Sequence, residues 1–270
     1  MNQQSAKVIW NKRVGPSCHR LGLLTDTGYS GATPGQFVTL KMDHGHDPLL
    51  RRPFSIHRLI PGVTGGDKTD GQGIEVLFKV VGRSTMTLSE LREGETVNVL
   101  GPLGQGFTIP ETHKDILLVA GGIGVAPLVF LAEFMVKKGV DPSCCRAFVG
   151  GATKDDLLCT DDFSSLGMET NVTTDDGSAG RKGLVTDLVK DVVTGKKPDM
   201  MYACGPHPML KSVAGLANEN GINCQLSLET VMVCGVGACL GCAINVEDKS
   251  GKYGHICADG PVFDSRSVFF

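Results

Sequence analysis

The sequence predicts a multi-domain fold in which an antiparallel β-barrel is followed by a doubly wound α/β domain and a small cysteine-rich segment. Three observations lead to this prediction. Residues 1–110 hold short strand-like stretches divided by glycine and proline turns, residues 111–229 alternate strands with helices, and residues 230–270 contain four of the ten cysteines. A chain of 270 residues is also longer than one ordinary core requires.

Six candidate strands occupy the first region, which is the number that a small antiparallel barrel needs. One helix is expected among them at residues 84–91, because Ser84 can cap its first turn and Leu88 and Leu91 fall on one side. A polar hairpin is expected at residues 61–73. The strands are expected at residues 7–13, 19–25, 35–42, 53–60, 74–82 and 96–100.

In the second region, strand-like and helix-like stretches alternate, which is typical of a parallel, doubly wound sheet. The last region is too short to build a core without a crosslink or a metal. We expect strands at residues 115–120, 144–151, 170–174, 199–205 and 223–228, and helices at residues 125–138, 184–192 and 207–220.

The composition is that of a soluble globular protein, with 41% apolar and 20% charged residues. The net charge of −3 gives no general attraction to nucleic acid or to an anionic membrane. The uncharged run at residues 116–132 is interrupted by three glycines and Pro127, which would break a lipid-facing helix. The N-terminus lacks the apolar core of an export signal. We therefore expect a cytoplasmic protein that binds neither nucleic acid nor membrane.

The stretch CGVGACLGC and a later cysteine give the spacing C-x4-C-x2-C…C, which is the plant-type pattern for a [2Fe–2S] cluster. A structural zinc site is the main alternative, although such sites usually show two separate C-x2-C pairs and this chain has one. Disulfides are a weaker alternative, since the other cysteines fall mostly in apolar runs, as reduced core cysteines do. The expected metal ligands are Cys234, Cys239, Cys242 and Cys257.

An iron–sulfur cluster carries one electron at a time, so another group held by this chain must handle the two-electron chemistry. In the stretch RPFS, Arg52 can place its guanidinium on a phosphate while the next residues face a planar ring. A plain strand with a charged first residue would look the same. Ser84 and Thr85 lie at the start of the expected helix, where free N–H groups and the helix dipole favour a pyrophosphate.

A second nucleotide site is expected in the α/β domain, where LLVAGGIGVAPL gives a strand, a glycine turn and a helix starting at Pro127. Two further stretches follow strands of the same sheet and therefore fall at its ligand-binding edge: TTDDGSAG, with Asp175, and YACGPHPM. Cys204 can face a nicotinamide there or be a core cysteine. The expected nucleotide-binding residues are Gly121, Gly122, Gly124, Asp175, Cys204 and Gly205.

Taken in order, RPFS, GRST, GGIGVAPL and YACGPHPM resemble the ferredoxin–NADP reductase superfamily. With CGVGACLGC and HICADGPVFD added, residues 7–263 resemble the electron-transfer subunits of type B dihydroorotate dehydrogenases. The resemblance implies an FAD-binding barrel at 1–110, an NAD-binding domain at 111–229 and a [2Fe–2S] module at 230–270. It also implies a set of FAD-binding residues: Arg52, Pro53, Phe54, Ser55, Lys79, Val80, Ser84 and Thr85. The family usually has Gly-Thr where this chain has Ser84-Thr85.

The resemblance implies that dihydroorotate reduces FMN in a separate catalytic subunit and that electrons then pass through [2Fe–2S] and FAD to NAD+, in pyrimidine biosynthesis. The expected assembly is a heterotetramer with two copies of each subunit. No catalytic acid or base is expected in this chain. Alternatives are the equivalent subunit of a sulfide dehydrogenase, a sulfhydrogenase or a ferredoxin-dependent transhydrogenase, and, from another class, a redox sensor without catalysis.

Two finer expectations follow from the sequence. Asp155 and Asp156, which follow the second strand of the sheet beside Lys154, should repel a 2′-phosphate and favour NADH over NADPH. The apolar residues around the cysteines, such as Leu240, and the tail at 259–270 should form a docking face for the catalytic subunit.

Overall fold

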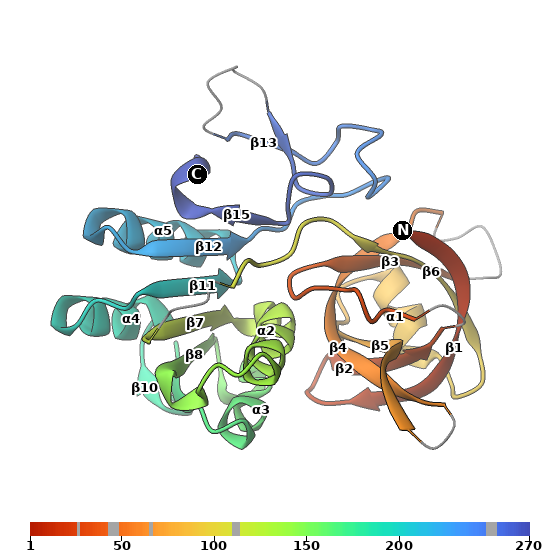
Figure 1. The fold of residues 1–270 in the computed structure, drawn as a ribbon, viewed down its shortest axis with the longest axis horizontal. Helices are drawn as coiled ribbons and strands as arrows, with labels where there is room; N and C mark the ends of the chain where they lie inside the picture. Colours follow the sequence, from red (N-terminus) through yellow and green to blue (C-terminus); the bar gives the residue numbers. More distant parts are fainter. Residues whose placement is uncertain (26–27, 43–48, 65–66, 110–113, 247–252) are drawn as a thin grey trace.

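The structure, a computed structural model, describes residues 1–25, 28–42, 49–64, 67–109, 114–246 and 253–270. A β-barrel and an α/β domain lie side by side, and the C-terminal segment lies along the upper side of both in Figure 1. The predicted multi-domain fold is confirmed, with a closed barrel followed by a parallel sheet that helices cover.

The barrel contains the six predicted strands, paired in the order β1-β2-β5-β4-β3-β6 and closed between β6 and β1. Alternate residues enter its core, as β6 shows with Val97 and Val99 buried and their neighbours more exposed. The expected hairpin at 61–73 includes residues 65–66, which lie outside the described residues; β4 and β5 pair as far as Thr64 and Asp67. The strands are β1 (Asn2–Arg13), β2 (Cys18–Leu24), β3 (Phe37–Met42), β4 (Arg52–Thr64), β5 (Asp67–Lys79) and β6 (Thr96–Leu103).

Helix α1 (Arg83–Glu90) begins one residue earlier than predicted, and Ser84 does not cap it. Thr85 instead fixes the two residues before the helix, because its hydroxyl accepts hydrogen bonds from the N–H groups of Val81 and Gly82 at 2.9 and 3.1 Å. Ser84 lies within the first turn, so the predicted placement of Ser84 and Thr85 at a helix N-terminus still holds.

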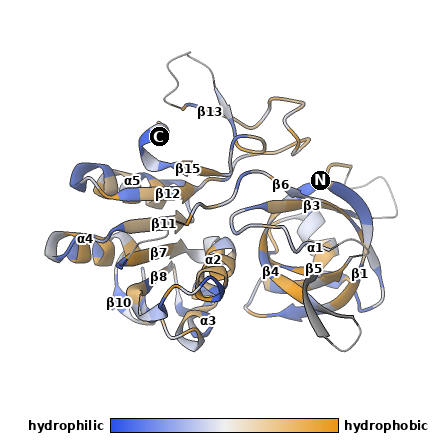
Figure 2. Ribbon diagram, in the orientation of Figure 1, coloured by the Kyte–Doolittle hydropathy of each residue, from blue (hydrophilic) through white to orange (hydrophobic). Residues whose placement is uncertain are grey.

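The α/β domain has a central sheet in the order β10-β9-β8-β7-β11-β12-β15. Its strands are parallel except for the last, and the strands near the centre carry the most hydrophobic residues in Figure 2. Helices α2 and α3 contribute to the core on one face, and α4 and α5 to the core on the other. The sheet consists of β7 (Ile116–Gly121), β8 (Cys145–Gly151), β9 (Glu169–Thr174), β10 (Arg181–Lys182), β11 (Met200–Cys204), β12 (Asn223–Ser227) and β15 (Val262–Asp264).

The three predicted helices of this domain are present as α2 (Val125–Lys137), α4 (Val185–Gly195) and α5 (His207–Asn220), and α3 (Thr160–Ser165) was not predicted. Helix α2 begins two residues before Pro127, directly after a 3-10 turn at Gly122–Gly124. It also packs against the barrel, where Phe130 joins the barrel core. Helix α2 is therefore the main structural link between the two domains.

The C-terminal segment contains a small ladder of β13 (Ala243–Ile244) and β14 (Gly254–His255) before β15. Strand β15 pairs antiparallel with β12, so the end of the chain extends the sheet of the α/β domain. The apolar tail predicted as part of a docking face packs partly onto this sheet, where Val262 is buried.

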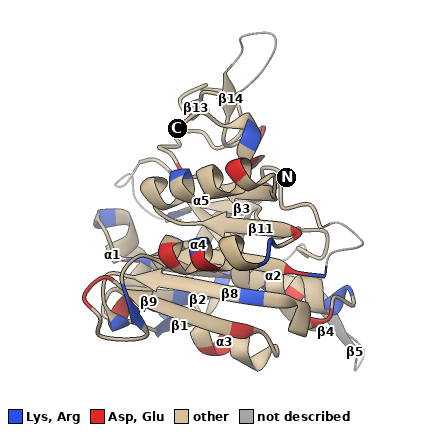
Figure 3. Ribbon diagram, turned by 90° about the vertical axis from the view of Figure 1, so that its left-hand side faces the viewer, with Lys and Arg blue, Asp and Glu red and all other residues tan. Residues whose placement is uncertain are grey.

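Lys and Arg residues are interspersed with Asp and Glu on the face drawn in Figure 3. Within the described ranges, no helix is long and apolar enough to cross a membrane.

Candidate functional site

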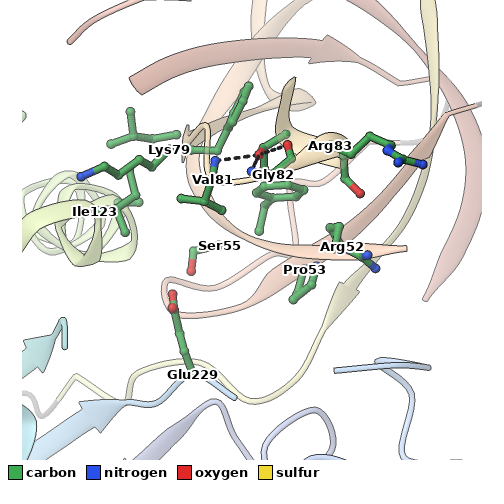
Figure 4. A pocket seen from close by; sticks show the side chains of 15 residues that line it. Arg52, Pro53, Ser55, Lys79, Val81, Gly82, Arg83, Ile123 and Glu229 are labelled. Carbon is green, nitrogen blue, oxygen red and sulfur yellow. Dashed lines mark hydrogen bonds between the residues drawn. The ribbon is translucent and has the colours of Figure 1, made fainter. Parts of the chain in front are cut away.

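A cavity of about 550 Å³ opens at the side of the barrel that faces the α/β domain (Figure 4). Its volume lies in the range usual for cofactor sites. Seven of the eight residues predicted to bind FAD line it: Arg52, Pro53, Phe54, Ser55, Lys79, Ser84 and Thr85. Val80 does not line the cavity; its backbone N–H donates to Ser17, and its neighbour Val81 lines the cavity instead.

The two ends of this cavity differ in chemistry. At one end, Arg52 donates only to the carbonyls of Leu50 and Arg51, both at 3.2 Å, and the described residues give it no carboxylate partner. The N-terminus of α1 lies on the same cavity and favours an anion. At the other end, Leu77, Ile123 and Ala126 provide apolar surface. A cationic, donor-rich end and an apolar end fit a flavin nucleotide, with its phosphates near Arg52 and its ring toward the α/β domain.

Glu229 is a titratable group in this cavity that sequence reasoning did not single out. Figure 4 shows it below Ser55 with its carboxylate directed into the cavity. The side chain is reachable from the cavity, but protein surrounds it on its other sides, and this desolvation raises the pKa of its carboxyl. Its surroundings in the sequence, LSLETV, carry no signal of a site, because the carboxylate is brought to the flavin cavity only by the path of the chain after β12.

Two further cavities begin where the first ends. One, of about 380 Å³, is lined by the glycine turn after β7, by Gly205 and His207, and by the C-terminal Phe269 and Phe270. The other, of about 430 Å³, lies at the carboxyl ends of β7, β8 and β9 and is lined by Asp156, Asp175 and Ser212, among others. Lys79 lines all three cavities. A dinucleotide can therefore extend from the edge of the sheet to the flavin cavity.

The predicted nucleotide-binding residues separate into two groups. Gly121, Gly122, Gly124, Asp175 and Gly205 line one or both of the nucleotide cavities. Gly124 also allows close packing, since a Cβ there would lie 2.4 Å from the carbonyl oxygen of Cys204. Cys204 itself is only 2% exposed, packs in the core and lines none of these cavities. Its role at the nicotinamide stays a prediction.

Three of the four predicted metal ligands lie in the loop before β13, and the fourth, Cys257, lies in the turn after β14, which contacts that loop. The sulfur atoms of Cys242 and Cys257 are 3.2 Å apart and buried, while Cys234 is half-buried and Cys239 is exposed. Within the described residues, no group of three or more His, Cys, Asp or Glu side chains is arranged to hold a single metal ion.

Backbone N–H groups point at the cysteine sulfurs. Val236 and Cys239 donate to Cys234 at 3.5 and 3.3 Å, and Gly237 donates to Cys257 at 3.1 Å. The bonds from Val236 and Cys239 lower the pKa of the Cys234 thiol to about 6. Gly237 has a φ of +78°, which lets its N–H turn inward. Four thiols with amide donors aimed at the sulfurs fit an iron–sulfur cluster, whose thiolate ligands such donors stabilise.

A small cavity of about 110 Å³ lies between β4, which we call the flavin strand, and the segment that leads to the cysteines. Pro53, Phe54 and Ser55 line one side, and Thr230 and Met232 line the other. The cysteine loop also rests on the barrel, since a Cβ at Gly235 would lie 3.0 Å from Thr39. The expected cluster and the flavin cavity are therefore neighbours.

Comparisons with known proteins agree with this arrangement. Residues 229–269 match the model of the iron–sulfur cluster binding domain of dihydroorotate dehydrogenase B, and residues 118–215 match the oxidoreductase NAD-binding domain. A solved NADH-dependent reduced ferredoxin-NADP oxidoreductase is 31% identical, with a TM-score of 0.82 over 98% of this chain and 89% of that chain. A ferredoxin NADP+ reductase from Neisseria gonorrhoeae, at 17% identity and a TM-score of 0.66, covers 82% of this chain and 92% of its own and shares the fold.

Two relatives are similar over nearly their whole length. The "Dihydroorotate dehydrogenase B (NAD(+)), electron transfer subunit" of Desulforamulus reducens is 39% identical over 97% of both chains. The protein of the same name from Caldanaerobacter subterraneus subsp. tengcongensis is 36% identical over 99% of both chains. The chain therefore belongs to the family of electron transfer subunits of dihydroorotate dehydrogenase B (NAD(+)).

Proposed function

We propose that this chain accepts electrons from a catalytic subunit that oxidises dihydroorotate and delivers them to NAD+. The observation that supports this best is the meeting of three cavities around Lys79, with the cysteine loop beside the first. When bound, a [2Fe–2S] cluster supplies one-electron transfer, and FAD exchanges single electrons with the two-electron chemistry of NAD.

The chain's own residues bind and orient these groups. Arg52 and the N-terminus of α1 would hold the flavin phosphates, and Phe54 and Ser55 would lie along the ring. Glu229, whose pKa is raised by desolvation, would lie beside the ring. The glycine turn at 121–124 would hold the nicotinamide nucleotide against the flavin, and the four cysteines would hold the cluster.

The catalytic subunit would dock beside the cysteine loop. Four apolar side chains there, which we call the cluster-side patch, are at least 40% exposed: Val231, Val233, Val236 and Leu240. Leu240 also has a positive φ of +59°, which is costly for a leucine, and its side chain is 59% exposed. A partner that carries FMN, in an assembly of two copies of each subunit, would cover this patch and bring its own flavin toward the cluster.

We keep the division at 1–110, 111–229 and 230–270 as part of this proposal. No disulfide joins any of the ten cysteines, all of which lie in described parts of the chain, and this is consistent with a reducing compartment such as the cytoplasm.

The proposal is tested by combining the purified chain with its catalytic subunit under anaerobic conditions. We expect dihydroorotate to reduce NAD+ only when both subunits are present, and the chain alone to pass electrons from NADH to a dye. Sulfide, hydrogen and reduced ferredoxin serve as competing donors. NAD+ reduction by one of these, but not by dihydroorotate, would show that the chain serves another complex. Absence of NADH oxidation by the holoprotein would contradict the proposal altogether.

A further inference from the structure

A β-bulge in the flavin strand turns two successive side chains toward the α/β domain. Ile56 of β4 pairs with Val76, but Arg58 pairs with Glu75, so one extra residue lies between these two pairs. Ile56 remains in the barrel core. His57 and Arg58 both contact the neighbouring domain, which a regular strand with alternating faces would not allow.

His57 joins the flavin strand to helix α2. Its Nδ1 atom is 2.9 Å from the carbonyl oxygen of Ala126, and its side chain is completely buried. A carbonyl can only accept a hydrogen bond, so Nδ1 must carry the hydrogen and donate it. Burial and the nearby Arg58 lower the pKa of His57 to about 3. The ring is therefore neutral at physiological pH, with a free electron pair on Nε2.

Arg58 completes the hydrogen bonding of this ring. Its Nη1 atom lies 3.3 Å from His57 Nε2 and can donate to it. The neutral ring forms no ion pair with Glu75, although its Nε2 lies 3.7 Å from that carboxylate. Arg58 is itself fixed by carboxylates of both domains, at 2.6 Å from Glu133 on α2, 2.7 Å from Asp162 on α3 and 3.4 Å from Glu75 on β5.

Both ends of the His57–Ala126 hydrogen bond lie next to the proposed site. Ser55, two residues before His57, lines the flavin cavity, and so does Ala126. Ala126 follows the turn at Gly122–Gly124, and this turn lines the nucleotide cavity of about 380 Å³. This one bond therefore links the strand that would carry the flavin to the turn that would carry the nicotinamide.

We propose that His57 is a positioning residue for hydride exchange, and that its Nδ1–H sets the spacing between the flavin strand and the nicotinamide turn. This inference rests on the proposed function. When both groups are bound, a hydride would pass from NADH to the flavin, leaving NAD+, and the accompanying proton would come from water; the part of His57 is to keep the two binding elements at a fixed spacing. The rate of such a step falls steeply when the reacting atoms are misplaced by a fraction of an ångström to 1 Å.

Two amide substitutions separate the nitrogens of the ring. In His57→Asn the side-chain amide lies near the position of Nδ1 and can still donate to Ala126. In His57→Gln the amide lies near Nε2, so it can meet Arg58 but leaves the carbonyl of Ala126 without its donor. The two variants match in polarity and hydrogen-bonding groups and differ by one methylene. His57→Leu removes both bonds.

The main measurement is the rate at which NADH reduces the bound flavin in stopped flow, with dithionite as a reductant that needs no positioning. We expect His57→Asn to stay within about threefold of the wild type. We expect His57→Gln and His57→Leu to be on the order of 10- to 100-fold slower with NADH, with a similar KM for NADH and unchanged dithionite reduction.

Hydrogen exchange provides a readout that does not depend on activity. In His57→Gln, peptides covering residues 121–130 should exchange faster than in the wild type, and in His57→Asn they should not. If His57→Leu fails to retain FAD, the comparison of the two amides still decides. Equal NADH rates and equal exchange in Asn and Gln variants would overturn the proposal. A wild-type flavin that NADH cannot reduce would instead contradict the proposed function.

Discussion

The ammonium of Lys79, at the end of the flavin strand's neighbour β5, lies 3.2 Å from the carboxylate of Asp156 in the α/β domain. This ion pair crosses the boundary between the two domains at the place where the three cavities meet. It partly neutralises Asp156, one of the two acids that line the nucleotide cavity of about 430 Å³. Asp175, the other, has no ion pair within the described part of the chain, and it therefore remains the main negative charge there.

The choice between NADH and NADPH should depend on Asp175. We expect Asp175→Ser to raise kcat/KM for NADPH by about fivefold, because removing repulsion between two charges near a wet surface is worth about 1 kcal/mol. Asp155→Asn is the matched control, since Asp155 lies outside the cavity although it was predicted to repel a 2′-phosphate. Kinetics with both nucleotides provide the measurement. A larger gain from Asp155→Asn than from Asp175→Ser would contradict this assignment.

Flavin affinity should depend on Arg52. We expect Arg52→Ala to weaken FAD binding about tenfold to a hundredfold, since a charge-assisted hydrogen bond to phosphate is worth about 1.5–3 kcal/mol. The measurement is the FAD content after dialysis, followed by titration of the apoprotein with FAD. Arg92→Ala, an exposed arginine away from the cavity, is the control. Unchanged FAD retention in Arg52→Ala would show that Arg52 does not bind the flavin phosphates and that RPFS is an ordinary strand without a binding role.

The iron–sulfur cluster should depend on Cys257. We expect Cys257→Ser to weaken or abolish the EPR signal of the reduced protein, because a hard oxygen ligand replaces a soft thiolate. Iron content and EPR are measured on anaerobically purified protein, with Cys144→Ser as a control at a half-buried cysteine outside the loop. Stoichiometric zinc without iron in the wild type would falsify the assignment of a cluster.

Docking of the catalytic subunit should depend on the cluster-side patch. Leu240→Asp places a charge on a side chain that is 59% exposed beside the cysteines. We expect it to weaken co-purification with the catalytic subunit and to spare NADH oxidation with a dye. Val14→Asp, at an exposed valine in the turn between β1 and β2, should leave assembly intact. If assembly survives Leu240→Asp, the docking face lies elsewhere.

The buried His57 should make the fold sensitive to acid. Its pKa is lowered from 6.5 to about 3 on folding, so the unfolded chain binds the extra proton between these values. The contribution of His57 to stability is therefore complete above about pH 6.5 and is lost as the pH falls toward 3. Between pH 7 and 5.5 the wild type should lose about 1 kcal/mol more stability than His57→Asn, which does not titrate. Urea unfolding at the two pH values measures this difference, and parallel pH dependence in both proteins would contradict it.

The sequence predicted the elements whose pattern is local. The six barrel strands, five of the six parallel strands and the three long helices all carry their hydrophobic period within one stretch, whereas the two-residue strand β10 does not and was missed. Helix α3 was missed because its six residues contain a single buried side chain, Phe163, which shows no period. Ser84 was predicted as a cap because its residue type suits one, but Thr85 is the residue whose hydroxyl accepts hydrogen bonds from the N–H groups just before the helix.

The parts of the site that were not predicted depend on contacts between distant segments. Arg52 and the cysteines have recognisable spacing, whereas Glu229 reaches the cavity only through the path of the chain after β12. The bulge that turns His57 toward Ala126 arises from the register of β4 against β5, and no residue in RPFSIHR indicates it. The side chain of Cys204 follows its position in the buried strand β11, which the sequence had left open.

Strand β15 occupies the edge that β12 would otherwise leave open. An uncovered edge strand presents unpaired N–H and C=O groups to other chains and is a common starting point for aggregation. The metal-binding segment thus also protects the nucleotide-binding sheet, and its last residues are fastened by the hydrogen bond from the hydroxyl of Ser265 to Asn218 on α5 at 2.8 Å.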